Sequence, residues 1–204
     1  MKWREELTRD IRFGDDRDYI DECYDFRNAS AEFSECNSNA LKSAFMSIRD
    51  KAKLIVEIGV HRNGQESSTC VFLDNKLPET LYVGIDIADK KFLDNPGKNI
   101  HTIINKSERV FDNMNEIARL TGQSIDEVVI DFLMIDGFHS INQMLVDWEY
   151  TRAVKSGVIG VHDSNRHPGP SRFTKYLDRT KYDVQKCCGA IDDNGISFIK
   201  RISN

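Results

Sequence analysis

Short apolar runs alternate with amphipathic segments from Lys53 onward. The runs are rich in Ile, Val and Leu on both faces, which is typical of strands buried between two layers of helices. They cover residues 54–59, 81–86, 100–105, 131–136 and 157–163. The helices expected between them cover about 64–74, 107–121, 140–155 and 170–179. Strand and helix in alternation predict right-handed βαβ units and an open parallel sheet.

The C-terminal pattern is different. The segments "KYDVQKCCGA" and "GISFIKRI" flank "IDDNG", and the Asn194-Gly195 pair within it is a strong hairpin signal. We therefore predict an α/β fold: a doubly wound, Rossmann-like domain with a seven-stranded sheet. The sheet is expected to be mostly parallel, with a C-terminal antiparallel hairpin and helices on both faces.

The first 50 residues form a separate segment by composition. They are rich in charged and small polar residues, with scattered aromatic residues. Within "NALKSAFMSIRD" the spacing places Leu41, Ala44, Phe45 and Ile48 on one helical face, so a helix is expected there. We expect residues 1–50 to be a helical segment on the substrate side and residues 51–204 to form the main domain.

Composition narrows the functional classes. The 204 residues are 40% hydrophobic and 30% charged, with a formal net charge of -5 and no long basic block. This balance is typical of a globular domain and disfavours binding to nucleic acid through phosphate neutralisation. No run of about 18 apolar residues exists to span a membrane. The charged start "MKWREELTRDIRFGDD" lacks the apolar core of a signal peptide, so we expect a cytoplasmic protein.

The cysteines support the same expectation. There are five, Cys23, Cys36, Cys70 and the adjacent pair Cys187-Cys188, with no framework spacing. An odd count of this kind predicts reduced thiols inside a cell. The adjacent pair could bind metal or act in redox chemistry, but packing within a strand is the favoured interpretation.

The first two strands end in residues suited to a nucleoside. The first runs into "VEIGVHRNG", with Glu57, Gly59 and Gly64. Ligands of open α/β sheets bind beyond the carboxyl ends of the strands, where glycine allows close approach. A tight turn explains Gly-x4-Gly equally well, since it is neither GxGxxG nor a phosphate loop. Asp86 ends the second strand, where an acid either binds ribose hydroxyls or caps a helix. Together these residues favour a nucleoside-containing ligand.

Two later strands end in an acid accompanied by histidine. Asp136 and Asp163 should lie close together, and two facing carboxylates repel unless a proton or cation lies between them. A hard divalent ion such as Mg²⁺ would relieve this repulsion. His162 can ligate only if its strand has ended by that point. His139 is placed to act as a general base. The alternative is that Asp136 and His139 only cap the helix that begins near Ser140.

With these motifs assembled, the chain resembles class I S-adenosylmethionine-dependent methyltransferases. Within that class it is similar to the branch of metal-dependent sugar and macrolide-glycoside O-methyltransferases and cephalosporin-hydroxylase-like proteins. The resemblance covers roughly residues 50–204. Its most specific stretch, 130–173, contains Asp-Gly-x-His, then Asp147, then Gly-x-Ile-x-x-His-Asp and Pro-Gly.

The resemblance implies a role for individual positions. It implies that S-adenosylmethionine is the cofactor, with Mg²⁺ or Mn²⁺ as a possible second one. The implied cofactor-binding residues are Glu57, Gly59, Gly64, Asp86, Ser107 and Asp136. The implied metal ligands are Asp136, His162 and Asp163, and the implied catalytic residues are His139, as general base, and Asp136. His162 departs from members that have a second acid at this position, which favours a softer ion such as Mn²⁺.

The expected function is therefore O-methylation of a hydroxyl on a small molecule or sugar. Two alternatives stay open: a non-catalytic module that binds a nucleoside or S-adenosylmethionine, and, with less support, an NAD-dependent oxidoreductase. We expect no nucleic-acid or membrane partner, and a homo-oligomer is possible. Arg166, His167 and Arg172 lie in a loop that either contacts the substrate or is simply solvated. No special role is assigned to His61, His101 or His167.

Overall fold

The computed structural model describes residues 33–60, 67–188 and 193–202. Gly64, His61 and most of the N-terminal segment lie outside these ranges. The α-helices are α2 (Glu35–Met46), α3 (Ser68–Asn75), α4 (Val110–Thr121), α5 (Ile141–Asp147) and α6 (Pro168–Tyr176). The strands are β1 (Leu54–Ile58), β2 (Leu81–Asp86), β3 (Ile100–Ile104), β4 (Phe132–Ile135), β5 (Val158–His162), β6 (Tyr182–Cys187) and β7 (Ile196–Arg201). Short 3₁₀ helices cover Lys91–Leu93, Pro96–Lys98 and Trp148–Ala153.

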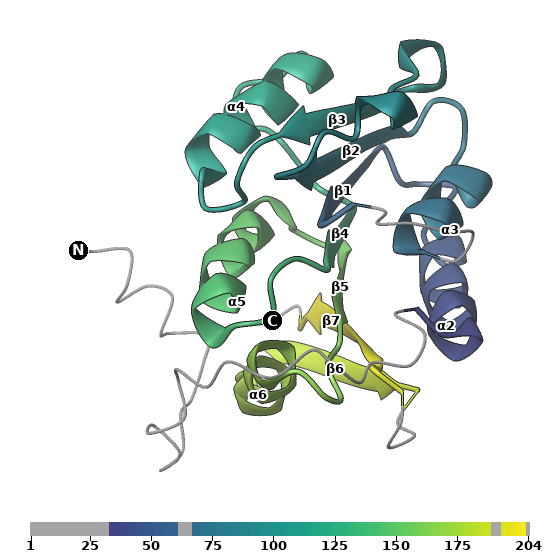
Figure 1. The fold of residues 1–204 in the computed structure, drawn as a ribbon. Coiled ribbons are helices and arrows are strands. Elements are labelled where there is room, and N and C mark those ends of the chain that lie inside the picture. The colour runs from purple at the N-terminus through teal and green to yellow at the C-terminus, as the bar shows by residue number, and fades with distance from the viewer. Residues whose placement is uncertain (1–32, 61–66, 189–192, 203–204) are drawn as a thin grey trace.

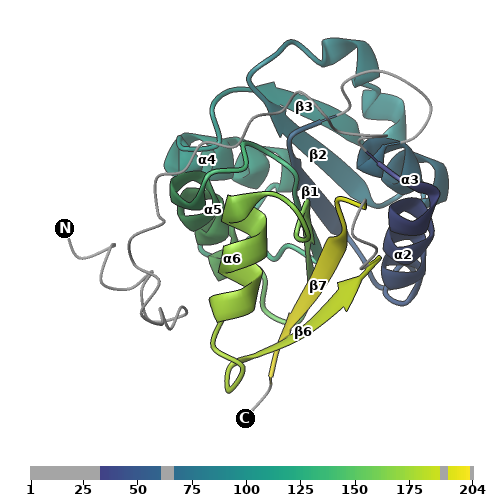
Figure 2. The same cartoon turned by 60° about the horizontal axis from the view of Figure 1, so that its bottom comes forward.

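The seven strands form one sheet in the order β3-β2-β1-β4-β5-β7-β6. Strands β1 to β5 pair in parallel, and β7 inserts antiparallel between β5 and β6. Helices α4, α5 and α6 cover one face of the sheet and α2 and α3 cover the other (Figures 1 and 2). The predicted fold, including the antiparallel C-terminal pair, is confirmed.

Alternating strand residues divide the core into two layers. On β1, Val56 belongs to the same core layer as Ile117 of α4, whereas Ile55 belongs to the layer that contains residues of α2 and α3. Leu41 and Phe45 of α2 are fully buried in this second layer, as the helical spacing predicts. Burying both faces of β1 explains its uninterrupted apolar character.

The four helices predicted between the strands differ from their expected bounds by a few residues, and two of the differences have a clear physical reason. The α6 helix begins at Pro168, because proline suits the first turn, where its missing N–H costs no hydrogen bond. The helix predicted over 140–155 is α-helical only to Asp147 and continues as a 3₁₀ helix to Ala153. In the described ranges, no helix is long and apolar enough to cross a bilayer.

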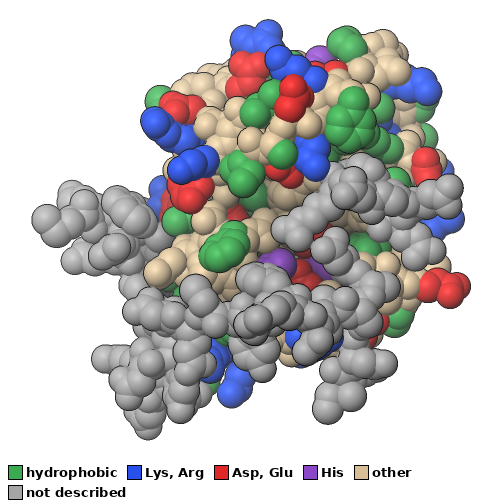
Figure 3. Space-filling model, viewed as in Figure 1, with side chains coloured by type: hydrophobic (Ala, Val, Ile, Leu, Met, Phe, Trp, Pro, Cys, Tyr) green, Lys and Arg blue, Asp and Glu red, His purple; other side chains and the backbone are tan. Residues whose placement is uncertain are grey.

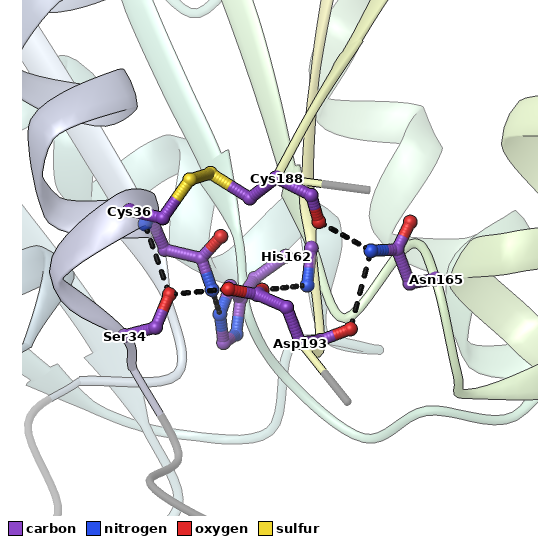
Figure 4. The surroundings of a disulfide bond; sticks show 8 residues. Ser34, Cys36, His162, Asn165, Cys188 and Asp193 are labelled. Atoms are coloured by element: carbon purple, nitrogen blue, oxygen red, sulfur yellow. Dashed lines mark hydrogen bonds between the residues drawn. A yellow bond between two sulfur atoms is a disulfide. The ribbon is translucent and has the colours of Figure 1, made fainter. Parts of the chain in front are cut away.

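The expectation of reduced thiols is wrong for two of the five cysteines. Cys36 and Cys188 form a disulfide with their Cα atoms 5.8 Å apart, across 152 residues of sequence. The bond joins the start of α2 to the end of β6 (Figure 4). Cys70 and Cys187 are free thiols. The pairing depends on how α2 packs against the sheet, which cysteine spacing does not reveal. The cysteine count therefore gives no support to a cytoplasmic location.

Candidate active site

The site lies where the strand order changes direction. The chain proceeds outward from β1 through β2 to β3, then returns to place β4 on the other side of β1. Ligands of doubly wound sheets bind at the carboxyl ends of the strands beside such a switch point. Gly59 follows β1 and Asp136 follows β4, so both lie at this point. The other described candidates lie within or just beyond the carboxyl ends of the same strands and of β2, β3 and β5.

Gly59 allows the ends of β1 and β4 to approach closely. Its φ of 81° lies in the left-handed region, and a Cβ there would be 2.1 Å from the carbonyl oxygen of Asp136. The Asp136 amide in turn donates to the Ile58 carbonyl over 2.8 Å. Only glycine fits this conformation and contact without strain. The glycine therefore sets the position of Asp136 as well as the shape of the turn.

Glu57 is a fully buried carboxyl on the α3 side of β1. Its carboxyl oxygens accept hydrogen bonds from the hydroxyls of Ser68, Thr69 (2.8 Å) and Tyr82. Burial raises the pKa of Glu57 to about 7, although these three hydroxyls oppose the shift. The three neutral hydroxyls satisfy the hydrogen-bonding capacity of the Glu57 oxygens, but they do not fully compensate the cost of burying the negative charge. Glu57 is therefore a tightly held group in the wall of the site, which becomes neutral near pH 7.

Asp86 connects the second strand to the turn after β1. One carboxylate oxygen accepts from the Val60 amide at 2.9 Å and the other from the Ala88 amide at 2.8 Å. Each oxygen can accept a further hydrogen bond. Asp86 does not cap an α-helix, because the next α-helix, α4, begins at Val110. It holds two loops in place at the edge of the switch point.

Ser107 is connected to α5. Its hydroxyl oxygen accepts from Gln143 at 2.8 Å, and the same Gln143 amide donates to Asp147 at 2.8 Å. Asp147 is buried, and desolvation raises its pKa to about 6 against the opposing hydrogen bonds from Ser107 and Gln143. This network places Ser107 next to the helix that follows Asp136.

The second pair of strand ends brings two carboxylates and an imidazole together. His162 Nδ1 is 3.0 Å from Asp136 Oδ1 and 3.3 Å from Asp163 Oδ2. Strand β5 ends at His162, and Asp163 has a φ of 58°, which is uncommon for a residue other than glycine. The chain therefore leaves the extended conformation at this point, and both side chains reach the same centre.

His139 and His167 complete the centre from two different helix starts. His139 Nε2 lies 2.5 Å from Asp163 Oδ2, and the His139 and His167 rings stack with centroids 4.1 Å apart. Ser140, whose hydroxyl accepts from the Gln143 amide, caps α5. Neither Asp136 nor His139 is needed for capping, so the capping alternative loses its basis. His167, to which the sequence assigned no role, belongs to this cluster.

Charges within the cluster stabilise one another. Burial alone would lower the pKa of His162, but the carboxylates of Asp136 and Asp163 outweigh it and raise the pKa well above the usual value. Burial opposes ionisation of Asp163 too, yet His162 and His139 hold its pKa below the usual value. Burial lowers the pKa of His167. The carboxylates therefore favour the charged form of His162, whereas burial favours the neutral form of His167.

Asn37 on α2 is a further member that sequence analysis missed. It is fully buried, and its Nδ2 lies 3.2 Å from His162 Nε2. Figure 4 shows His162 beside the segment that carries the Cys36–Cys188 disulfide, where Ser34 also donates to Asp193 at 2.6 Å. No local motif marks Asn37, because its contact spans 125 residues.

The donor set suits a divalent cation. One ligand atom from each of Asp136, His162 and Asp163 lies within 4.8 Å of the others, and both carboxylates are at the carboxyl edge of the sheet. Two carboxylates and one imidazole fit Mg²⁺ or, better, Mn²⁺. The Gly59 turn and Asp86 lie on the other side of Asp136. A nucleoside-containing group placed at the switch point would reach both. Histidine and acidic side chains are visible together on the face shown in Figure 3.

No family model matches the sequence, and no curated protein matches it. Several solved structures are similar in fold. The MycE methyltransferase of the mycinamycin biosynthetic pathway, in complex with Mg, SAH and mycinamycin VI, has 16% identity and a TM-score of 0.53. The match covers 80% of this chain and 48% of that one, so this chain spans about half the length of MycE.

Two further structures match over most of both chains. An O-methyltransferase from Bacillus cereus in complex with SAH has 16% identity and a TM-score of 0.59, covering 86% of this chain and 85% of that one. A methyltransferase from Geobacter sulfurreducens has 18% identity and a TM-score of 0.54, covering 83% and 80%. At these identities the likeness establishes the fold: this chain has the fold of these methyltransferases.

Proposed function

We propose that this protein is an S-adenosylmethionine-dependent methyltransferase that methylates a hydroxyl of a small molecule or sugar, assisted by a divalent cation. The observation that carries the proposal is the arrangement at the switch point. The Gly59 turn and Asp86 lie on one side of Asp136, and a cluster of His139, His162 and Asp163 lies on the other. One side is suited to a nucleoside and the other to proton transfer beside a cation.

The cofactor side would hold S-adenosylmethionine through hydrogen bonds. Asp86 accepts from the ribose hydroxyls with its remaining lone pairs while two backbone amides fix its orientation. Gly59 lets the turn after β1 lie directly against Asp136. Glu57 and Ser107 would lie on the cofactor side as buried and helix-anchored polar groups. When bound, the cofactor supplies a methyl group on a sulfonium, a good electrophile with a neutral leaving group.

The catalytic side would remove the proton of the acceptor hydroxyl. His139 accepts this proton, and the 2.5 Å contact with Asp163 orients its ring and stabilises the imidazolium. The hydroxyl oxygen forms a bond to the methyl carbon as the carbon–sulfur bond breaks, and the electron pair returns to sulfur. Asp136, His162 and Asp163 would hold Mg²⁺ or Mn²⁺, which supplies Lewis acidity that lowers the pKa of a nearby hydroxyl. The residues around the site orient the reactants and exclude water, which contributes much of the rate.

A calorimetric titration tests the proposal directly. The purified chain is titrated with S-adenosylmethionine and with NAD, each with and without Mg²⁺ or Mn²⁺. We expect micromolar binding of the methyl donor and none of NAD. Asp86→Asn should weaken binding about tenfold or more, because a hydrogen bond to a charged group contributes about 1.5–3 kcal/mol.

Asp74→Asn is the matched control, since Asp74 is an exposed acid on α3 away from the strand ends. It should bind as the unaltered protein does. Absence of methyl-donor binding under all conditions, or equal binding of NAD, would contradict the proposal. Binding followed by no methyl transfer to any hydroxyl acceptor, tested with radiolabelled cofactor, would support a non-catalytic binding module instead.

A further inference from the structure

Asp163 has imidazoles on two sides. His162 and Asp136 lie on one side and form the cation site proposed above. On the other side, His139 Nε2 lies 2.5 Å from Asp163 Oδ2 and His167 Nε2 lies 3.8 Å from Oδ1. The ligand atoms of His139, Asp163 and His167 lie within 4.8 Å of one another. The two sets share Asp163 but differ in their remaining donors.

The backbone holds the second set together. The Gly169 amide donates to the His139 carbonyl at 3.0 Å, and a Cβ at Gly169 would lie 2.3 Å from that oxygen. The His167 amide donates to the Asp163 carbonyl at 3.2 Å. Glycine therefore lets the start of α6 approach the start of α5 closely. The local turn from Asp163 to His167 and the Gly169–His139 contact together bring both imidazoles to the same carboxylate.

The conformation of Asp163 is a second, independent observation. Its φ of 58° lies in the left-handed region, and its side chain is only 5% exposed. A non-glycine residue in this region costs free energy, and such outliers gather at functional sites. Here the conformation turns the carboxylate so that one oxygen faces His139 and His162 while the other faces His167. Both oxygens have imidazole neighbours.

The donor types decide which ion fits. Mg²⁺ prefers oxygen ligands and keeps most of its water, whereas imidazole nitrogen suits Zn²⁺ and other late first-row ions. Two imidazoles and one carboxylate are the three-ligand set used by zinc sites that keep an open position. The Asp136–His162–Asp163 set has the opposite balance, with two carboxylates and one imidazole.

We propose that His139, Asp163 and His167 form a second ion site, which binds a divalent transition-metal ion of the Zn²⁺ type. This site is distinct from the oxygen-rich set that includes Asp136. One consequence rests on the proposed function: His139 cannot bind the ion and accept the hydroxyl proton at the same time. Zn²⁺ in this site would therefore inhibit methyl transfer, whereas Mg²⁺ beside Asp136 would assist it.

Zn²⁺ binding to the folded full-length chain tests the site without cofactor or substrate. Equilibrium dialysis with the metal alone, in the presence of excess Mg²⁺, should give one bound Zn²⁺ per chain. His167→Ala should weaken this binding by more than about tenfold, since loss of even an outer hydrogen-bond partner of a metal ligand costs 10–100-fold. His167→Asn provides a second variant of similar size. Co²⁺ absorption bands, which depend on nitrogen ligation, should change in both.

Three matched variants separate the alternatives. His101 lies on β3, an edge strand that β2, β1 and β4 separate from β5. His101→Ala should therefore bind Zn²⁺ normally. Cys187→Ser removes a free thiol and should also have no effect. Asp136→Asn should lose the response to Mg²⁺ but keep Zn²⁺. The second site is refuted if His167→Ala binds Zn²⁺ like the unaltered chain, or if Cys187→Ser or Asp136→Asn abolishes the binding. Failure to bind S-adenosylmethionine would refute the proposed function and leave the Zn²⁺ result intact.

Discussion

The carboxyl groups at the ends of β1 and β5 lie in the same site but have opposite environments. Glu57 is surrounded by hydroxyls, which are neutral, and burial raises its pKa to about 7. Asp163 is surrounded by imidazoles, and His162 and His139 hold its pKa below the usual range despite burial. Both are almost completely shielded from water. The partners, and not the degree of burial, decide whether each carboxyl carries a charge near neutral pH.

In the proposed function, this difference would give separate tasks to the two halves of the sheet. The β1–β2 half provides neutral or backbone-bonded groups that can hold an uncharged ribose without a strong local field. The β4–β5 half concentrates charge, which suits proton transfer and cation binding. The helix α2 covers the second half through Asn37, and the Cys36–Cys188 disulfide fixes its start to β6. Four predictions test this division.

Breaking the disulfide should produce the largest change. Cys36 and Cys188 close a loop of 152 residues, for which chain-entropy arguments give a stabilisation of up to about 5 kcal/mol. We expect Cys188→Ser, or reduction of the unaltered chain, to lower the melting temperature followed by circular dichroism. Cys187→Ser is the control, because this neighbouring thiol is free. Equal melting temperatures before and after reduction would show that the disulfide does not hold α2 in place.

Removing His139 should slow methyl transfer without weakening cofactor binding. A positioned general base contributes about 10²–10⁴-fold to rate, so His139→Ala should slow methyl transfer by that factor. Affinity for S-adenosylmethionine should stay within about twofold, because the proposed cofactor contacts are on the β1–β2 half. Radiolabelled transfer and calorimetry on the same preparation measure both quantities. A large loss of cofactor affinity would contradict the assignment of cofactor binding to the β1–β2 half and of catalysis to the β4–β5 half.

The sequence predicts the framework of this site well. Apolar runs identify all five parallel strands, and neighbouring parallel strands must place Asp136 and Asp163 side by side. It also places His139 and His162 near these acids. These inferences succeed because they depend on local patterns and on the general rule that strand ends converge.

The missed residues depend on tertiary packing. His167 lies beside Asp163 through a local turn, but it meets His139 because Gly169 lets the start of α6 approach the start of α5. Asn37 and Cys36 reach the site through the docking of α2, across more than 100 residues of sequence. Gly59 was expected to admit a ligand, but its immediate neighbour is the Asp136 backbone. Close backbone approaches of this kind leave no pattern other than the glycine itself.

Glu57→Gln should change how stability depends on pH. The unfolded carboxyl ionises near 4.5 and the folded one near 7, so the folded state binds a proton more tightly over this interval. Stability from this group is greatest below pH 4.5 and falls as pH rises to 7, by about 3 kcal/mol at 1.36 kcal/mol per pKa unit. Glutamine does not ionise, so the variant should not lose this stability as the pH rises. The surrounding hydroxyls can turn to accept hydrogen bonds from its amide.

Urea denaturation at pH 4.5 and pH 8 measures this effect. Relative to the unaltered chain, the free energy of unfolding of Glu57→Gln should rise by about 3 kcal/mol between pH 4.5 and pH 8. Glu79→Gln, a change of an exposed acid before β2, should show no such gain. A pH-independent difference for Glu57→Gln would mean that the buried carboxyl ionises normally, and the contrast with Asp163 would disappear.

Changing Asn37 should give the smallest of the four effects, and it tests the β4–β5 half most specifically. Its Nδ2 faces His162 Nε2, while its Oδ1 is buried without a hydrogen-bond partner. In this orientation the proton of a neutral His162 ring lies on Nδ1 and points at the carboxylates. If the amide turns over, Oδ1 accepts from Nε2–H, and Nδ1 is left with a lone pair facing Asp136 and Asp163. Only that second tautomer can ligate a cation.

Asn37→Asp and Asn37→Leu separate these two states. Aspartate provides only acceptors and should keep or strengthen Mn²⁺ binding, whereas leucine leaves Nε2 unpaired and should weaken it about tenfold, as loss of an outer partner does elsewhere. Leucine should also cost about 1–3 kcal/mol of stability for the unpaired nitrogen. Dialysis with Mn²⁺ and thermal melts of both variants provide the measurements. Equal Mn²⁺ affinity for the two would show that α2 covers the charged centre without controlling the orientation of His162.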